Sequence, residues 1–98
     1  MLKKMEARIR IVVWIRHDAE TTYPLGKGRF IVSPDLPMAS ILQRVRKRMR
    51  LRPDQAIFMF ADNTLISPQS LAREVHSKHA KEGVLHLTCA KENVFGCL

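Results

Sequence analysis

The chain has 98 residues and a net charge of +8 at pH 7, from 17 Lys and Arg against 9 Asp and Glu. This length gives one domain with a single modest core, and a hydrophobic fraction of 46% excludes an intrinsically disordered chain. No apolar stretch reaches the roughly 18 residues that cross a bilayer, and the first residues lack the apolar segment of a secretory signal, so we expect an intracellular protein. The charge favours anionic partners, namely nucleic acid, acidic lipid or acidic peptides, without choosing among them.

The first half of the chain predicts two strands and a helix. Residues 8–16 alternate between β-branched apolar and other side chains, which predicts a strand with one core face. Residues 17–28 contain the glycines and proline of a loop, and residues 29–32 predict a second strand that pairs back on the first. From Met38 to Met49 the apolar residues recur every three or four positions, which predicts an amphipathic helix of about three turns.

The second half predicts three more strands, two before a shorter helix and one after it. Residues 56–60 predict a strand buried on most sides, and residues 64–66 predict a brief edge strand. Ser67 followed by Pro68 predicts an N-cap and the first position of a helix that covers residues 69–78. Residues 84–89 alternate again and predict a last strand.

This order of elements predicts an α+β fold, the ubiquitin-like β-grasp. We expect a mixed sheet of four to five strands, with one main crossing helix and a second, shorter helix. We also expect a short N-terminal extension over residues 1–8, the ubiquitin-like domain over residues 9–90 and a flexible C-terminal conjugation tail over residues 91–98. Because β-grasp domains also serve as adaptors and redox proteins, the fold alone does not give the function.

The C-terminal tail carries the strongest candidate for chemistry, Gly96. A glycine near a free end has no side chain to block a narrow groove, so its carbonyl can be threaded into a protease or an activating enzyme. A glycine in an ordinary frayed terminus is the alternative. Cys97 is not the fourth residue from the end, the position that prenylation requires.

Five blocks of the sequence occur together in a known family. Residues 29–32 read Arg-Phe-Ile-Val, residues 45–51 read Val-Arg-Lys-Arg-Met-Arg-Leu and residues 53–60 read Pro-Asp-Gln-Ala-Ile-Phe-Met-Phe. Residues 83–88 read Gly-Val-Leu-His-Leu-Thr, and residues 92–96 read Glu-Asn-Val-Phe-Gly. In this order the blocks resemble the autophagy ubiquitin-like modifiers related to GABARAP and microtubule-associated light chain three. The resemblance covers most of residues 8–96 and implies a modifier, not an enzyme.

The resemblance implies covalent attachment through the tail. In this family a cysteine protease removes the residues after the glycine, activating and conjugating enzymes carry its carboxylate, and the product is an amide with phosphatidylethanolamine. Gly96 is then the conjugation and cleavage residue, Phe95 the anchor in the enzyme groove, and Cys97 and Leu98 the piece removed. Arg48 matches a helix arginine that contacts the processing enzyme. We expect a monomer without cofactor or metal, in the cytoplasm and, after conjugation, partly on autophagosomal membranes.

The resemblance also implies that the chain binds short peptides of the form aromatic-x-x-aliphatic. Such peptides add a strand to the edge of the sheet and place two side chains in two pockets. The residues that match the first pocket are Val12, Arg29, Ile31 and Val84. The residues that match the second pocket are Phe30, Val32, Ile41 and Val45. Trp14 accompanies Val12 on the outer face of the first strand. An ordinary hydrophobic core explains Ile31, Ile41 and Val45 equally well.

Three features depart from the family pattern. About eight residues precede the first strand, where lipid-conjugated members carry two helices, so we expect the N-terminal helical lobe to be absent. Arg44 stands where relatives have an apolar pocket residue, and Ser33 where they have proline. The first strand also lacks the family's Pro-Val-Ile-x-Glu pattern. These departures leave open the sister type, an autophagy modifier conjugated to a protein lysine in a membrane-tethering complex.

Two other interpretations stay open, an unconjugated β-grasp adaptor and a nucleic-acid-binding domain. The six basic residues from Arg44 to Arg52 would contact phosphates. A solvated helix face explains them better, because few aromatic residues stand near them to stack on bases. Cys89 alternates inward and is predicted to be a small buried side chain, and His76 and His79 lack a third metal ligand.

Overall fold

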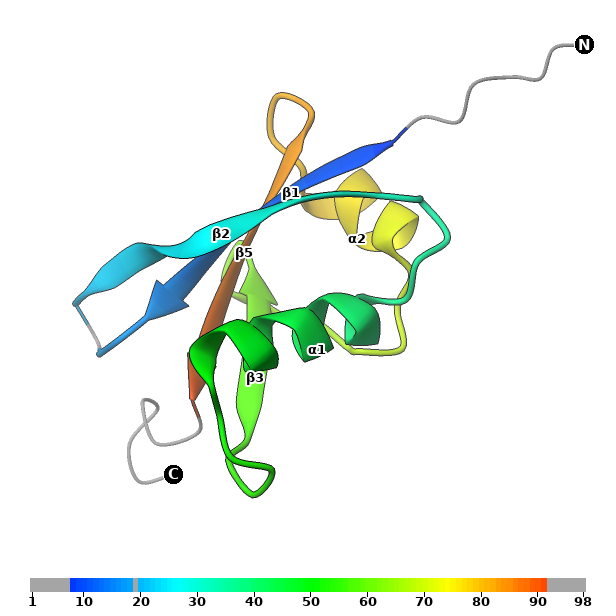
Figure 1. Cartoon of the computed structure of the whole chain (residues 1–98). Coiled ribbons are helices and arrows are strands. Elements are labelled where there is room, and N and C mark those ends of the chain that lie inside the picture. The colour runs from blue at the N-terminus through cyan, green and yellow to red at the C-terminus, as the bar shows by residue number, and fades with distance from the viewer. Residues whose placement is uncertain (1–7, 19, 92–98) are drawn as a thin grey trace, which may run out of the picture.

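The structure is a computed structural model that describes residues 8–18 and 20–91. Its elements are β1 (Ile9–Arg16), β2 (Thr22–Val32), α1 (Met38–Met49), β3 (Ile57–Ala61), β4 (Thr64–Leu65), α2 (Ala72–His79) and β5 (Val84–Lys91). The strands form one sheet in the order β2-β1-β5-β3-β4. β1 and β5 run parallel at its centre, and the other neighbours are antiparallel. Figure 1 shows α1 crossing one face of this sheet, so the predicted α+β, ubiquitin-like fold is confirmed.

One face of the sheet and the apolar stripes of the two helices form the core. The alternation of β1 buries every second residue, and the three-four spacing of α1 does the same along the helix. The largest fully buried side chains are Ile11, Met38, Ile41, Met59, Leu85, Leu87, Val13, Val45 and Cys89. Each large apolar side chain buried in this way stabilises the fold by about 1.5–3 kcal/mol. The core therefore joins the apolar faces of α1, β1, β3 and β5 in one cluster.

The two helices begin against each other. Met38 and Ala39, in the first turn of α1, donate their backbone N–H groups to the carbonyls of residues 70 and 68. Ala72 and Arg73, in the first turn of α2, donate to the carbonyls of residues 36 and 34. These bonds satisfy N–H groups that have no partner inside either helix. The two segments before the helices thus serve as caps for each other.

This exchange makes the predicted start of the second helix wrong. α2 begins at Ala72, and the Ser67 hydroxyl accepts the Gln69 N–H within a turn that precedes the helix. The Glu74 carboxylate accepts the N–H of Leu71 at the helix start, a contact that sequence spacing alone did not single out. The Ser-Pro pair predicted a helix start from neighbouring residues alone, whereas the observed start of α2 is set by hydrogen bonds to a segment more than 30 residues away.

The predicted loop over residues 17–28 is also wrong, because β2 begins at Thr22. The actual turn is short, and the Asp18 carboxylate closes it by accepting the N–H groups of Glu20 and Thr21. The glycines and Pro24 lie inside β2, opposite a register irregularity of β1. Proline and glycine are tolerated there because β2 is an edge strand with an irregular stretch. The hairpin is therefore longer than the sequence indicated.

The strand predicted to be buried on most sides has one exposed face. In β3 the residues Ile57, Met59 and Ala61 are buried, whereas Phe58 between them is exposed. A tight turn then leads into β4, which confirms the predicted edge strand near residues 64–66. Asp62 and Asn63 both have positive φ, as two-residue hairpins with the favoured twist require.

Candidate functional site

The predicted conjugation residues lie outside the part of the chain that the structure describes. These residues are Phe95, Gly96, Cys97 and Leu98. What the structure shows is the base of this segment. β5 is a central strand with partners on both sides, and it continues to Lys91, where the description ends. Arg16 at the end of β1 is paired with Ala90. The sheet thus fixes the point from which residues 92–98 leave.

A basic pocket of about 400 Å³ adjoins this point. Arg16, Arg48 and Lys91 line it from β1, α1 and β5, together with His17 of the first turn. Its apolar walls come from Ile15, Tyr23, Leu25 and Met49. Arg48, the predicted contact of the processing enzyme, therefore lies at the same end of the molecule as the base of the tail. The pocket's charge suits an anionic group.

The residues predicted for the first peptide pocket meet on the outer face of the sheet, away from α1. Val12 is paired with Arg29, and Arg10 is paired with both Ile31 and Val84 on its two sides. The Ile31 side chain is 64% exposed, and Val12 and Val84 are half-buried. The structure therefore brings these side chains together on three adjacent strands, β2, β1 and β5.

Trp14 lies two residues along the same face of β1. It is half-buried, and its indole N–H donates to Nδ1 of His86 on the neighbouring strand at 3.1 Å. The two rings are tilted, with centroids 6.2 Å apart. A tryptophan whose N–H has a partner presents mainly apolar ring surface. His86 was not among the predicted site residues. Once the parallel register of β1 and β5 is known, its pairing with Val12 places it beside the predicted residues.

The residues predicted for the second peptide pocket are part of the core. Phe30 and Val32 are each 5% exposed, and Ile41 and Val45 are fully buried between β2 and α1. Two arginines of α1 stand over the ring of Phe30. The guanidinium carbon of Arg44 is 5.9 Å from the ring centroid, and that of Arg48 is 5.1 Å away. The surface at this place is therefore formed by two cations, not by aliphatic side chains.

Comparison with known proteins identifies the family. A family model described as "Autophagy protein Atg8 ubiquitin like" matches residues 1–96. Autophagy-related protein 8A of Oryza sativa is 36% identical over 89 residues, which cover 89% of this chain and 75% of the relative. The chain belongs to the Atg8 family.

Two further matches agree with this assignment. Autophagy-related protein 8 of Candida glabrata is 38% identical over 73 residues, which cover 74% of this chain and 62% of the relative. The crystal structure of Trypanosoma brucei ATG8 matches the fold with a TM-score of 0.77 at 24% identity, over 91% of this chain and 77% of that one. The predicted resemblance to the autophagy ubiquitin-like modifiers is confirmed by these findings.

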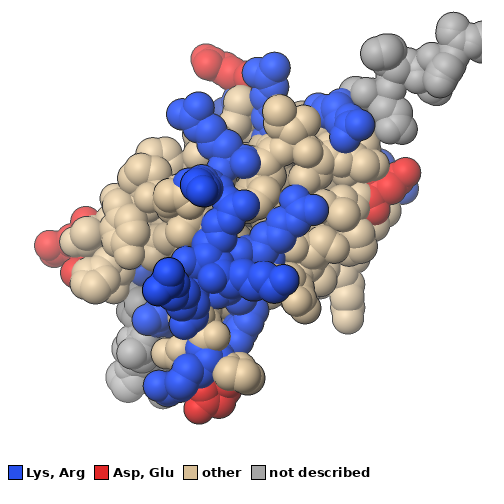
Figure 2. Space-filling model, in the orientation of Figure 1, with Lys and Arg blue, Asp and Glu red and all other residues tan. Residues whose placement is uncertain are grey.

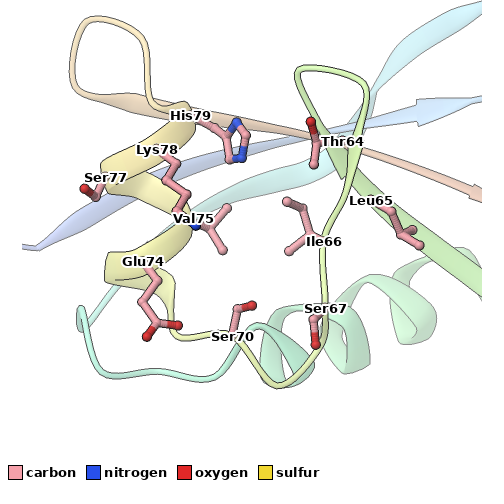
Figure 3. Close-up of a pocket in the computed structure, with 10 residues that line it drawn as sticks. All are labelled: Thr64, Leu65, Ile66, Ser67, Ser70, Glu74, Val75, Ser77, Lys78 and His79. Carbon is pink, nitrogen blue, oxygen red and sulfur yellow. The ribbon is translucent and has the colours of Figure 1, made fainter.

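A larger pocket of this Atg8-family chain, about 580 Å³, lies between α2 and the segment from β4 to Ser70. Figure 3 shows Val75 and Ile66 projecting into it, with Glu74 and Ser70 at one end and His79 and Thr64 at the other. Two of its ionisable groups, Glu74 and His79, have contacts within the fold. Glu74 caps the start of α2, and Nδ1 of His79 lies 3.1 Å from a carboxylate oxygen of Asp62.

Asp62 also has a cationic neighbour. Lys81 lies 2.9 Å from its other carboxylate oxygen. Hydrogen bonds from Lys81 and then His79 hold the pKa of Asp62 below its ordinary value of 3.8. This cluster ties the turn after β3 to the end of α2 and the segment before β5. The pocket thus lies beside a structural ion pair.

The residues most often associated with catalysis have structural environments in the Atg8-family chain. Cys89 is fully buried, as predicted, and burial raises the pKa of its thiol to about 12. Nε2 of His76 lies 3.3 Å from the carbonyl oxygen of Gly83. Within the described residues, no group of three or more potential metal ligands is found. In the same part of the chain, no helix is long and apolar enough to cross a membrane.

The basic residues of α1 divide into two groups. Arg46 donates to the carbonyls of Gln55 and Arg52 at 2.7 and 2.9 Å, and so holds the segment between α1 and β3. Nε of Arg52 in turn lies 3.2 Å from the carboxylate of Asp54. The exposed basic residues that remain on or next to the helix are Arg44, Lys47, Arg48 and Arg50. Figure 2 shows Lys and Arg side chains gathered in a band across this face of the molecule.

Proposed function

We propose that the chain is a ubiquitin-like modifier of autophagy, cleaved after Gly96 and conjugated through that glycine to phosphatidylethanolamine. Membership of the Atg8 family is the observation that carries this proposal. The sequence Glu-Asn-Val-Phe-Gly follows closely after β5, a central strand whose two neighbours hold it in place. Residues 92–96 can span roughly 17 Å when extended, which is enough to place Gly96 in an enzyme groove while the domain stays outside.

The chemistry belongs to the partner enzymes, and the chain supplies the acyl group. A protease hydrolyses the peptide bond between Gly96 and Cys97 and leaves a glycine carboxylate. An activating enzyme adenylates this carboxylate with ATP, which releases pyrophosphate, and an enzyme thiol then displaces AMP to give a thioester. The amine of phosphatidylethanolamine finally displaces the enzyme thiolate to give an amide. Arg48, beside the base of the tail, is proposed to contact the processing protease.

Lipid attachment would change where the domain resides. One acyl chain gives a membrane association constant of about 10⁴ M⁻¹, whereas two chains give stable anchoring. The conjugated protein would thus move from the cytoplasm to autophagosomal membranes. There it would present β2, one of the two edge strands of the sheet, to partner proteins. An extended peptide can add a strand at such an edge and place an aromatic side chain near Val12, Ile31 and Val84.

Reconstitution tests the proposal. The full chain is incubated with Atg8-type protease, activating and conjugating enzymes, ATP and liposomes that contain phosphatidylethanolamine, and intact mass is measured. We expect loss of Cys97-Leu98 followed by a lipid adduct, and neither product with Gly96→Ala. Gly26→Ala, a glycine change with open space around the added methyl group, serves as the matched control and should be conjugated normally.

Other products would select the alternatives. In a cell lysate, a Gly96-dependent bond to a protein lysine would replace the lipid proposal with the protein-conjugated type. An intact C-terminus with every enzyme active would leave an unconjugated adaptor. Salt-dependent RNA binding that disappears when Arg44 and Lys47 are substituted would favour the nucleic-acid-binding domain.

A further inference from the structure

A pair of arginines covers the surface where α1 packs against β2. Arg44 and Arg48 are four residues apart on α1, so they lie on the same side of the helix. Both guanidinium carbons lie within 6 Å of the centroid of the Phe30 ring. Both side chains are exposed, and within the described residues neither forms an ion pair with a carboxylate. Two sets of guanidinium donors are thus held over one aromatic ring.

This arrangement disfavours an aliphatic ligand at this surface. The apolar residues beneath the arginines are 5% exposed or less, so little apolar surface is left for a leucine side chain to cover. A docked leucine would also have to remove water from two charged groups without giving them hydrogen-bond acceptors, which costs free energy. The hydrophobic gain of roughly 25 cal/mol for each Å² removed from water would therefore be small here.

A carboxylate has the opposite properties. Each of its oxygens can accept N–H groups from a guanidinium, and such charge-assisted bonds are about twice as strong as neutral ones. The flat Phe30 ring fixes the two guanidinium groups from below, so less side-chain freedom is lost when a ligand binds. An acidic side chain is therefore the better match for this surface.

The surroundings carry the same charge. β2 itself exposes Lys27. Figure 2 shows Lys and Arg side chains gathered in a band over the face that carries α1. A long acidic segment would be attracted to this face before it docks, because the chain as a whole has a net charge of +8. The free edge of β2 gives such a segment a strand to pair with.

We propose that β2 binds extended acidic protein segments that place Asp or Glu, not an aliphatic residue, against Arg44 and Arg48. The inference rests on the peptide docking along β2 described under the proposed function. Arg44 is the residue that sets the preference, because it lies over Phe30 and adds the second cation. The preferred pattern is thus aromatic-x-x-acidic.

A peptide pair tests this preference directly. Two fluorescent peptides of about ten residues carry tryptophan at one position and either glutamate or leucine three residues later, and are otherwise identical. Binding to the full chain is measured by fluorescence anisotropy in low and physiological salt. Because the pair is solvent-exposed, we expect a moderate preference of about five- to tenfold for the glutamate peptide, which falls as salt rises.

Three variants locate the preference. Arg44→Leu should reverse it, so that the leucine peptide binds more tightly, and Arg48→Gln should reduce it. Lys47→Gln removes the same charge from the same helix, but Lys47 has no contact with Phe30, so it should weaken both peptides equally and leave the ratio unchanged. Thermal melting of each variant shows whether its fold is kept.

Three results would overturn the inference. The first is a wild-type chain that binds the leucine peptide as tightly as the glutamate peptide or more tightly. The second is a folded Arg44→Leu variant with an unchanged ratio. The third is a wild-type chain that binds neither peptide at millimolar concentration. None of these results affects conjugation through Gly96, which is scored by mass in a separate assay.

Discussion

Gly28 tests the tight packing of the β1–β2 hairpin. A methyl group added at this buried position of β2 would lie 2.8 Å from Cβ of Leu25, 2.8 Å from the Leu25 carbonyl oxygen and 3.1 Å from the Val13 carbonyl oxygen. Two of these three atoms belong to the backbone and cannot rotate away. The hairpin must therefore shift to accept the Gly28→Ala substitution.

The expected cost follows from these contacts. Forcing an extra methyl group into a packed site destabilises a protein by about 1–3 kcal/mol. In a domain of this size each kcal/mol lowers the melting temperature by about 4–8 °C, so we expect Gly28→Ala to melt about 5–20 °C below wild type. Gly26→Ala is the matched control, because nothing lies within 4 Å of its added methyl group and its φ is not positive. It should melt at the wild-type temperature or slightly above, because alanine lowers the entropy of the unfolded chain.

Circular dichroism melts of the two variants, measured side by side, check this reasoning. If Gly28→Ala melts with the control, or if Gly26→Ala is the less stable of the two, the irregular stretch of β2 does not pack as described. A melting temperature that falls by the expected amount should be accompanied by weaker binding of peptides to β2, because the shift lies in the docking strand itself.

Three further predictions concern side chains outside the docking strand. Cys89 should resist iodoacetamide at pH 8 until the protein is unfolded, as peptide mass mapping would show. Because burial raises the pKa of the Cys89 thiol to about 12, the contribution of this thiol to the free energy of unfolding is complete below pH 9 and is lost between pH 9 and about 12. Lys81 lowers the pKa of Asp62, so the contribution of this carboxylate to stability is complete above pH 3.8 and is lost as the pH falls further. Asp62→Asn should therefore reduce the loss of stability below pH 4 in acid titrations. Arg46→Gln should lower the free energy of unfolding in urea by about 1–3 kcal/mol, since it removes two charged hydrogen bonds to backbone carbonyls, whereas Lys47→Gln should change it by less than about 0.5 kcal/mol.

Most of the fold could be predicted because its signals are local and periodic. The alternation of β1 and the three-four spacing of α1 each name one buried face, and the structure buries those faces. The short hairpin after β3 was signalled by Asp62 and Asn63, which tolerate positive φ. Errors arose where local signals competed with distant contacts, as at Ser67 and in the glycine-containing part of β2.

The candidate site divides in the same way. The family resemblance predicted that the residues of the first pocket lie close together, and the strand pairing brings them together. These residues are Val12, Arg29, Ile31 and Val84. The two arginines that cover the residues predicted for the second pocket could not be predicted, because their positions depend on where the ends of these long side chains lie. The four-residue spacing of Arg44 and Arg48 was visible in the sequence, but their common position over Phe30 was not.

The sequence by itself determined the ubiquitin-like fold and the family, because strand alternation, helix periodicity and short motifs are properties of neighbouring residues. Tertiary structure alone decided how the helices begin and which side chains cover the surface where α1 packs against β2. The carbonyls of residues 34 and 36 cap α2 in place of Ser67, since backbone donors take whichever acceptors the packed chain brings near. Arg44 and Arg48 meet over Phe30 because the core fixes α1 against β2. The surface at this place is therefore formed by two cations, not by apolar side chains.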